Sequence, residues 1–257
     1  MADKKVSLIL TSYNCRENIK RTLKSIEQQD YPAIEVIIID GLSTDGTVDV
    51  IKEYEKNTKY QCQWVTEKDK GLYDAMNKGF RLSTGDIVAF FNDLFLTSKA
   101  VSLMVAAIEE GDYDGAHADL IYAQDDKVKR YWRMGQGKLI NGWMPGHPTL
   151  YLKRDIYEKY GLYNIEYKCS ADYEFMIRML KDGEIRLAYV PFTIIRMYYG
   201  GTSTESAGSY VVSLKEAHQA LKENGIRYAW WIDFRRTIRV AKQFLMAKRY
   251  TGKINEE

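Results

Sequence analysis

Short polar clusters stand directly after apolar runs at several points in the first hundred residues. Asp40 closes the run EVIIID (35–40), and Asn92 and Asp93 follow IVAFF (87–91). Carboxylate and amide oxygens can bind a hard divalent cation or accept a hydrogen bond from a ligand N–H group. A short apolar run is typical of a buried strand. Each cluster is therefore predicted to lie at the carboxyl end of a strand.

The runs that position these clusters alternate with helical patterns. Strands are predicted at 6–10, 35–40, 62–67 and 87–91, and helices over 16–29 and 97–110 and around 48–54 and 75–80. Four strand–helix repeats imply right-handed crossovers and an α/β fold, with a mostly parallel central sheet flanked by helices. In such a sheet, ligands bind outside the carboxyl ends of the strands. The polar clusters are therefore expected to meet at one edge.

The rhythm changes after about residue 115. Segments 119–123 and 128–133 predict a hairpin, 134–147 a glycine-rich loop, and 148–154 a further strand. A helix is predicted over 170–183, and the tail from about 208 onward has a purely helical pattern. We therefore expect a domain over 1–205 and a C-terminal helical extension over 206–257.

The composition is typical of a globular protein of the cytoplasm. The 257 residues are 46% hydrophobic and 28% charged, and the formal net charge of +2 argues against a nucleic-acid partner. No apolar run approaches the roughly 20 residues that span a bilayer, and the N-terminus lacks a secretory cleavage pattern. The three cysteines are widely spaced without CxxC, which favours a reducing compartment.

Two nucleotide-binding signatures, GxGxxG after the first strand and GxxxxGK[ST], are missing. The landmarks that are present, in order, are VSLILTSYN, EVIIIDGLSTDGT, KGLYDAMNKGFRLSTGDIVAFFND, HPTLYLKRDIYEKYGLYN, SADYEF and YYGGTS. Together they resemble the family 2 glycosyltransferases, which have the GT-A fold, over about residues 4–205. The form GLYDAMNKG is similar to a bacterial subgroup that assembles surface polysaccharides. The resemblance implies an inverting transferase that moves a hexosyl or N-acetylhexosaminyl group from a UDP-sugar to a glycan or lipid-linked acceptor.

The resemblance also implies roles at the donor. Thr11 and Asp40 match residues that hold the uracil and ribose, and a carboxylate suits uracil because its N3–H is a donor. Tyr13 and Lys70 match positions near the base, and Asn77 matches one that faces the donor. The alternative for Asp40 is the role of a helix-capping loop residue. For the others, the alternatives are an ordinary loop residue (Tyr13), a solvated surface residue (Lys70) and an ordinary helical residue (Asn77).

The family's metal motif normally carries two carboxylates, which bind Mg²⁺ or Mn²⁺ through the donor diphosphate. This chain has one, Asp93, beside the donor-side amide of Asn92. Phosphate and water can complete the octahedron, so Asp93 is predicted to contact a Mg²⁺ or Mn²⁺ cofactor. The alternative is weakened metal binding in a nucleotide-sugar-binding protein with impaired catalysis. His147 is a second candidate contact for metal or phosphate, against a structural role.

Asp172, in SADYEF, occupies the position of the family's catalytic base. Inverting transfer needs one carboxylate that removes the proton of the acceptor hydroxyl as its oxygen attacks the anomeric carbon. Capping of a helix N-terminus is the alternative, and Glu174 is the second choice for the base. The glycine turn at 200–203 matches a loop near the donor phosphates.

The segment 225–250 interleaves aromatic and aliphatic residues with arginines and lysines. A basic, aromatic, amphipathic helix suits the surface of an anionic bilayer, where a lipid-linked acceptor would be found. The protein is therefore expected in the cytoplasm, peripheral at the inner face of the cell membrane. The alternative is that this helix packs on the catalytic domain or on a second subunit.

Overall fold

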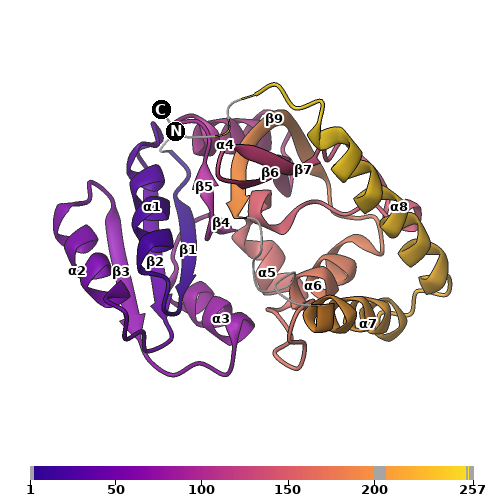
Figure 1. Ribbon diagram of the computed structural model, residues 1–257, viewed down its shortest axis with the longest axis horizontal. Helices are drawn as coiled ribbons and strands as arrows, with labels where there is room; N and C mark the ends of the chain where they lie inside the picture. The colour runs from indigo at the N-terminus through magenta and orange to yellow at the C-terminus, as the bar shows by residue number, and fades with distance from the viewer. Residues whose placement is uncertain (1–2, 199–206, 253, 255–257) are drawn as a thin grey trace.

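The computed structural model describes residues 3–198, 207–252 and 254 of the chain. Within these ranges, one nine-stranded sheet of order β3-β2-β1-β4-β8-β6-β9-β5, with β7 paired to β6, runs through the molecule between helices (Figure 1). The first half comprises β1 (Val6–Ser12), α1 (Arg16–Glu27), β2 (Ile34–Asp40), α2 (Thr47–Asn57), β3 (Gln61–Thr66), α3 (Leu72–Leu82), β4 (Ile87–Phe90), β5 (Leu94–Phe95) and α4 (Ala100–Glu110). The second half comprises β6 (Gly115–Gln124), β7 (Lys127–Trp132), the 3₁₀ turns η1 (Leu139–Asn141) and η2 (His147–Thr149), β8 (Tyr151–Lys153), α5 (Arg154–Tyr160), α6 (Ala171–Leu180), β9 (Leu187–Tyr198), α7 (Ala207–Glu223) and α8 (Ala229–Ala247).

The continuous apolar run of β2 is explained by burial on both faces of the sheet. Ile37 and Ile39 lie in a core with α3, α5, α6 and α7, whereas Val36 and Ile38 lie in a core with α1 and α4. Successive side chains of a strand point to opposite faces, so the run Val36–Ile39, which is covered on both sides, is apolar at every position. Gly79 lets α3 approach β1 closely, since a Cβ there would stand 2.3 Å from Cγ2 of Ile9.

The four predicted strands of the first half are confirmed as β1 to β4, and they pair in parallel. This brings the residues after β1, β2 and β4 to one edge. In the second half, β8 pairs antiparallel to both β4 and β6, the hairpin β6–β7 forms as predicted, and β9 lies parallel to β6. The mostly parallel arrangement therefore holds for the first half, and the sheet as a whole is mixed.

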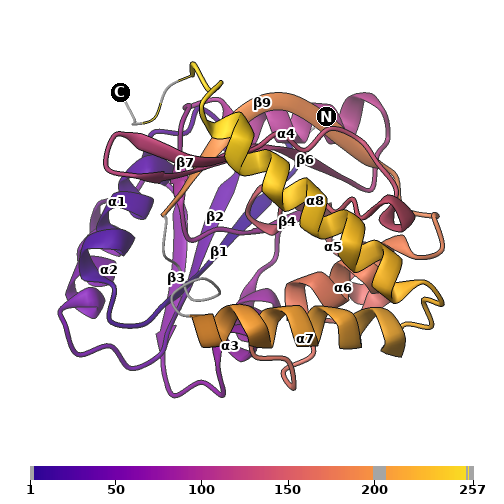
Figure 2. The same cartoon turned by 45° about the vertical axis from the view of Figure 1, so that its right-hand side comes forward.

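The two C-terminal helices close the second half of the molecule. α7 packs on α6, and α8 crosses β7 and η1 (Figure 2). Ala217, Ala220 and Leu221 of α7 and Ile232 of α8 belong to the same core as α6. The helical extension expected after residue 205 therefore contributes buried side chains to the core of the second half.

Candidate active site

Three strand ends form the floor of the site. Ser12 pairs with Asp40 in the parallel register of β1 and β2. On the other side of β1, the backbone N–H of Thr11 donates to Oδ1 of Asn92 at 2.9 Å, and Nδ2 of Asn92 donates to Oγ1 of Thr11 at 2.8 Å. The predicted convergence of Thr11, Asp40 and Asn92 at one edge is thus present. Since the amide of Asn92 is engaged with Thr11, it acts on the site by fixing the chain just before Asp93.

Asp40 is fully buried and holds the surrounding loops. Its carboxylate accepts hydrogen bonds from the hydroxyls of Ser12 (2.9 Å), Ser43 (2.6 Å) and Thr66 (2.8 Å), and from the backbone N–H of Ser43 (2.9 Å). Four donors match the acceptor capacity of a carboxylate. In this structure Asp40 therefore ties together β1, β2 and β3, and contact with a uracil would require one of these bonds to open.

The other residues expected near the base differ in exposure. Tyr13 is 68% exposed and stands over Gly41, at the mouth of the edge. Lys70 is also exposed, and its backbone N–H donates to Asp74 at the start of α3. Close by, Nζ of Lys78 lies 2.6 Å from Oδ1 of Asp69, whose other oxygen adjoins Gly41. Asp69 is therefore a further acidic group at this edge.

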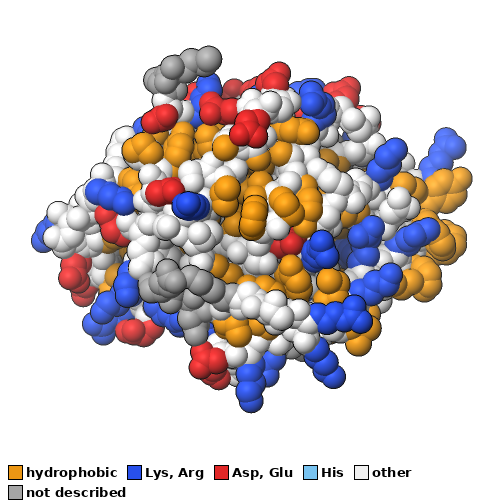
Figure 3. Space-filling view, turned by 90° about the horizontal axis from the view of Figure 1, so that it is seen from above, with side chains coloured by type: hydrophobic (Ala, Val, Ile, Leu, Met, Phe, Trp, Pro, Cys, Tyr) orange, Lys and Arg blue, Asp and Glu red, His pale blue; other side chains and the backbone are white. Residues whose placement is uncertain are grey.

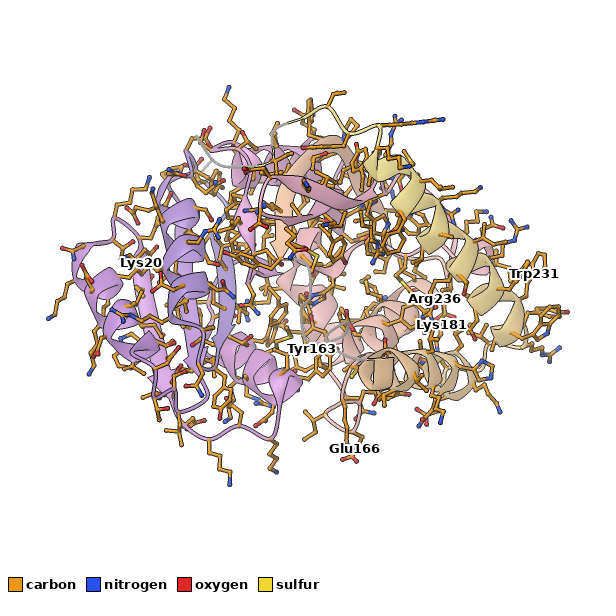
Figure 4. All side chains as sticks on the ribbon, in the orientation of Figure 1. Lys20, Tyr163, Glu166, Lys181, Trp231 and Arg236 are labelled. Carbon is orange, nitrogen blue, oxygen red and sulfur yellow. The ribbon has the colours of Figure 1, made fainter. Side chains whose placement is uncertain are left out.

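Asn77 clamps the backbone of Tyr163 through both atoms of its side-chain amide. Its Nδ2 donates to the backbone oxygen of Tyr163 at 2.8 Å, and its Oδ1 accepts the backbone N–H of Tyr163 at 3.0 Å. The side chain is buried. In this structure Asn77 is directed at the loop after α5, so it determines where the ring of Tyr163 lies. Figure 4 places Tyr163 in the middle of the molecule, between α3 and α6.

Asp172 lies in the first turn of α6, within a group of phenols and one imidazole. The hydroxyl of Tyr73 donates to its Oδ1 at 3.0 Å, and the hydroxyl of Tyr163 lies 2.8 Å from Nε2 of His147. Burial lowers the pKa of His147, and nearby Asp172 partly offsets this effect. His147 is therefore a neutral imidazole at neutral pH, stacked on Phe90 at the end of β4.

Asp93 follows Phe90 by three residues, and the ring of Phe90 packs against His147 and Tyr163 of this group. It is 9% exposed, and burial raises its pKa to about 7, although the backbone N–H of Tyr198 donates to it. Burial also raises the pKa of Tyr122, on which Asp93 and Asp172 both act electrostatically. Contacts connect the end of β4 to Asp172, because Phe90 packs on Tyr163, Tyr163 packs on Tyr73, and Tyr73 donates to the carboxylate. The strand end that precedes the expected metal ligand is thus linked to the expected base.

The described residues contain no cluster of three or more His, Cys, Asp or Glu side chains that could hold a metal ion. Asp93 is the acidic side chain after β4, and a cation would offset its desolvation. One such ligand fits an ion carried mainly by a diphosphate and does not fit a protein-built cage.

Glu174, the second choice for the base, has a structural position. It is buried and forms an ion pair with Arg178 at 2.8 Å, and Nδ2 of Asn224 donates to it at 3.2 Å. Its pairing leaves Asp172 as the carboxylate of α6 that contacts the phenols. The glycine turn at 200–203 lies outside the described residues.

A carboxylate from the C-terminal extension holds the segment that leads into Asp172. Glu216 of α7 accepts the backbone N–H groups of Lys168 (2.9 Å), Cys169 (2.8 Å) and Ser170 (3.0 Å). These donors precede the first turn of α6. α7 therefore determines the direction in which α6, and with it Asp172, enters the site. Sequence reasoning missed Glu216, Tyr73, Tyr122 and Tyr163, because nothing local distinguishes them from ordinary helical or core residues.

Replacing Glu216 by Ala is expected to lower the free energy of unfolding by about 2–4 kcal/mol, because it removes charge-assisted hydrogen bonds and leaves backbone N–H donors without an acceptor. We expect kcat to fall more than the donor KM changes, since α6 loses its fixed orientation. Urea denaturation and steady-state kinetics measure both effects. The exposed neighbour Lys215→Ala is the control, and equal behaviour of the two variants would contradict a positioning role for Glu216.

The comparisons with known proteins agree with one another. The sequence model described as "Glycosyl transferase family 2" matches residues 7–178. A PGL/p-HBAD biosynthesis glycosyltransferase of Mycobacterium tuberculosis is 27% identical over 209 residues, covering 79% of this chain and 80% of the relative. Another M. tuberculosis glycosyltransferase is 30% identical over 181 residues, covering 67% and 68%.

Solved structures share the fold at lower identity. S. aureus TarS 1-349 in complex with UDP-GlcNAc superposes with a TM-score of 0.71 and 19% identity, over 91% of this chain and 72% of that one. The mannosyltransferase PcManGT from Pyrobaculum calidifontis, in complex with GDP-Man and Mn²⁺, gives 0.68 and 18%, over 98% and 77%. The mixed sheet with its flanking helices is therefore a GT-A-like fold.

Proposed function

This chain belongs to glycosyl transferase family 2 and is a glycosyltransferase, and from that premise we propose that it transfers a sugar from a UDP-sugar to a hydroxyl of a glycan or lipid-linked acceptor, with inversion. The observation that carries the proposal is the chain of contacts from the end of β4 to Asp172, through Phe90, Tyr163 and Tyr73. Asp93 follows β4, at the strand edge where α/β folds bind ligands. Asp172 lies in the first turn of α6, at the other end of these contacts.

In the proposed reaction, the acceptor oxygen forms a bond with the anomeric carbon as the bond to the diphosphate breaks. UDP leaves with the electron pair of that bond, and Asp172 takes the proton of the acceptor hydroxyl. The hydrogen bond from Tyr73 to Oδ1 fixes the carboxylate and leaves Oδ2 for this proton. The clamp from Asn77 to Tyr163 and the hydrogen bond between Tyr163 and His147 form a rigid wall beside it.

A divalent cation fits this scheme as a partner of the donor. Asp93 would hold it, with His147 as the second candidate, and the bound ion would offset the charge that develops on the departing diphosphate. The Mn²⁺ reported with PcManGT supports this assignment. Tyr13 at the open edge is positioned to border the base, and Asp69 adds an acceptor near it.

The experiment is an assay of UDP and GDP release with a panel of nucleotide sugars, with and without Mg²⁺ or Mn²⁺, using lipid-linked and soluble glycan acceptors. We expect release from a UDP-sugar that depends on the acceptor. The single carboxylate at Asp93 favours a second candidate, a protein that binds nucleotide sugars with impaired turnover. Donor binding without release under every combination would support that candidate and contradict the first.

A lipid-linked acceptor would place the enzyme at the inner face of the cell membrane, in the assembly of surface polysaccharide.

A further inference from the structure

α8 has an inner face that is committed to the protein. Ala229, Ile232 and Gln243 are buried. The guanidinium of Arg236 lies 4.7 Å from the ring centroid of Tyr173, the residue next to Asp172, and Nε of Arg239 donates to the backbone oxygen of Asn141 at 3.0 Å. In Figure 4, Arg236 points from α8 toward α6. These contacts fix α8 on the second half of the molecule, against α6 and η1.

The outer face of α8 carries a stripe of exposed apolar side chains. Trp230 is 66% exposed, Phe234 55%, Ile238 41% and Leu245 72%. Their spacing of four, four and seven residues places them on one side of a helix. Trp231 borders the stripe and projects away from the body of the molecule in Figure 4. A contiguous exposed apolar surface of this kind marks an interaction site.

Basic residues border the stripe. Arg235, Lys242 and Arg249 recur every seven residues along its edge. Residues 225–252 contain seven Lys and Arg and one acidic residue, Asp233, which gives a net charge of +6 against +2 for the whole chain. Figure 3 shows hydrophobic side chains gathered at the right-hand end of the molecule, with Lys and Arg side chains beside them.

The basic surface continues at the turn between α7 and α8. Lys222, Arg227 and Trp230 line a hollow of about 400 Å³ there. A cationic hollow that includes an indole is suited to a lipid headgroup phosphate, because tryptophan prefers the boundary between headgroups and acyl chains. Among helices of the described ranges, none has the length and apolar character to cross a membrane.

We propose that the outer face of α8 docks on the surface of an anionic lipid bilayer, with the apolar stripe in the acyl boundary and the basic border among the headgroups. This is the arrangement of an interfacial amphipathic helix. A second copy of the chain would bring an identical basic border with no acidic partner on α8 beyond Asp233, which is already paired with His218 and Arg236. The basic border of α8 therefore favours an anionic bilayer over a second copy of the chain.

Docking on this face places the active site near the lipid surface. The inner face of α8 contacts Tyr173, so about one helix diameter, roughly 10 Å, separates the bilayer side from α6. This consequence rests on the proposed lipid-linked acceptor, whereas the docking itself does not.

The test is co-sedimentation of the full chain with vesicles of phosphatidylcholine, alone or mixed with phosphatidylglycerol, without donor or acceptor. We expect binding to the mixed vesicles that weakens with salt. The triple variant Trp230→Ser, Phe234→Ser and Leu245→Ser is expected to bind about 100-fold more weakly. Replacing Arg235, Lys242 and Arg249 by Gln should also weaken binding to anionic vesicles by about 100-fold, from about fivefold per basic residue.

Matched controls are Lys20→Gln with Lys24→Gln on α1, and Phe192→Ser on β9, where Phe192 is 58% exposed. These should bind like the unaltered protein, and thermal unfolding verifies that each variant folds. The proposal is overturned if the unaltered chain binds neither vesicle, or if the α8 variants and controls bind equally. It is also overturned if light scattering finds a dimer that the apolar variants convert to a monomer. Because no sugar is transferred in this assay, its failure is separate from failure of the proposed activity.

Discussion

Replacing Asp172 by Asn is expected to lower kcat by about 10²–10⁴-fold, the usual contribution of a positioned general base. The amide has the same shape and can still accept the hydrogen bond of Tyr73 at Oδ1. It cannot take a proton from the acceptor hydroxyl. Release of UDP in the presence of acceptor measures the loss, and the KM for the donor should change little because the proposed base would act on the acceptor hydroxyl.

Two variants separate catalysis from stability in this experiment. Asp182→Asn removes an exposed carboxylate just after α6 and should retain full activity. Glu174→Gln breaks a buried ion pair with Arg178, so it should lower the free energy of unfolding before it affects chemistry. An Asp172→Asn enzyme that keeps most of its kcat would remove the base from the proposed reaction.

The sequence predicted the first half of the fold well because β1, β2 and β4 are mostly apolar and are separated by helical patterns. It did not predict α5, β5 or β9. β9 is twelve residues long, but Pro191 interrupts its pattern, and proline is confined to bulges and edges of sheets. The structure has a shift of register at this point, where the partners of Ala118 and Asp119 are Val190 and Thr193. A bulge turns Phe192 out to solvent and breaks the alternation that identifies a strand.

The site was predicted as a set of strand ends, and that part depends on topology alone. Asp172 is linked to the end of β4 by Tyr73 and Tyr163, which the sequence did not single out because they come from α3 and from the loop after α5. Asn77 and Asp40 belong to the predicted set, but their hydrogen bonds connect segments up to 86 residues apart. Local sequence cannot distinguish a polar side chain that holds two loops together from one that awaits a ligand.

Asp93 exemplifies a residue whose expected function opposes stability. Its carboxyl has a pKa of about 7 in the folded chain, against an ordinary value of 3.8. A folded-state pKa that is raised above the unfolded value means that the folded protein binds the proton more tightly. The stability gained from that proton is fully present below about pH 4 and is lost as the pH rises through about 7.

Asp93→Asn is therefore expected to be more stable than the unaltered protein at alkaline pH. The neutral amide can accept the backbone N–H of Tyr198 through its oxygen and avoids burial of a charge. A shift of about three pKa units corresponds to about 4 kcal/mol of unfolding free energy at about pH 8, and the difference should disappear below about pH 4. Urea denaturation in the presence of a chelator, at several pH values, measures it.

The same substitution should also reduce the stabilisation of the protein by a bound cation. UDP with Mn²⁺ is expected to raise the thermal midpoint of the unaltered protein by mass action, and to do so much less for Asp93→Asn, whose amide lacks the charge that a divalent ion favours. A variant that is more stable alone, but less stabilised by UDP with Mn²⁺, would identify Asp93 as a carboxylate kept for the ion at a cost in stability. Equal stabilisation of both proteins by UDP with Mn²⁺ would mean that the diphosphate holds the ion without Asp93.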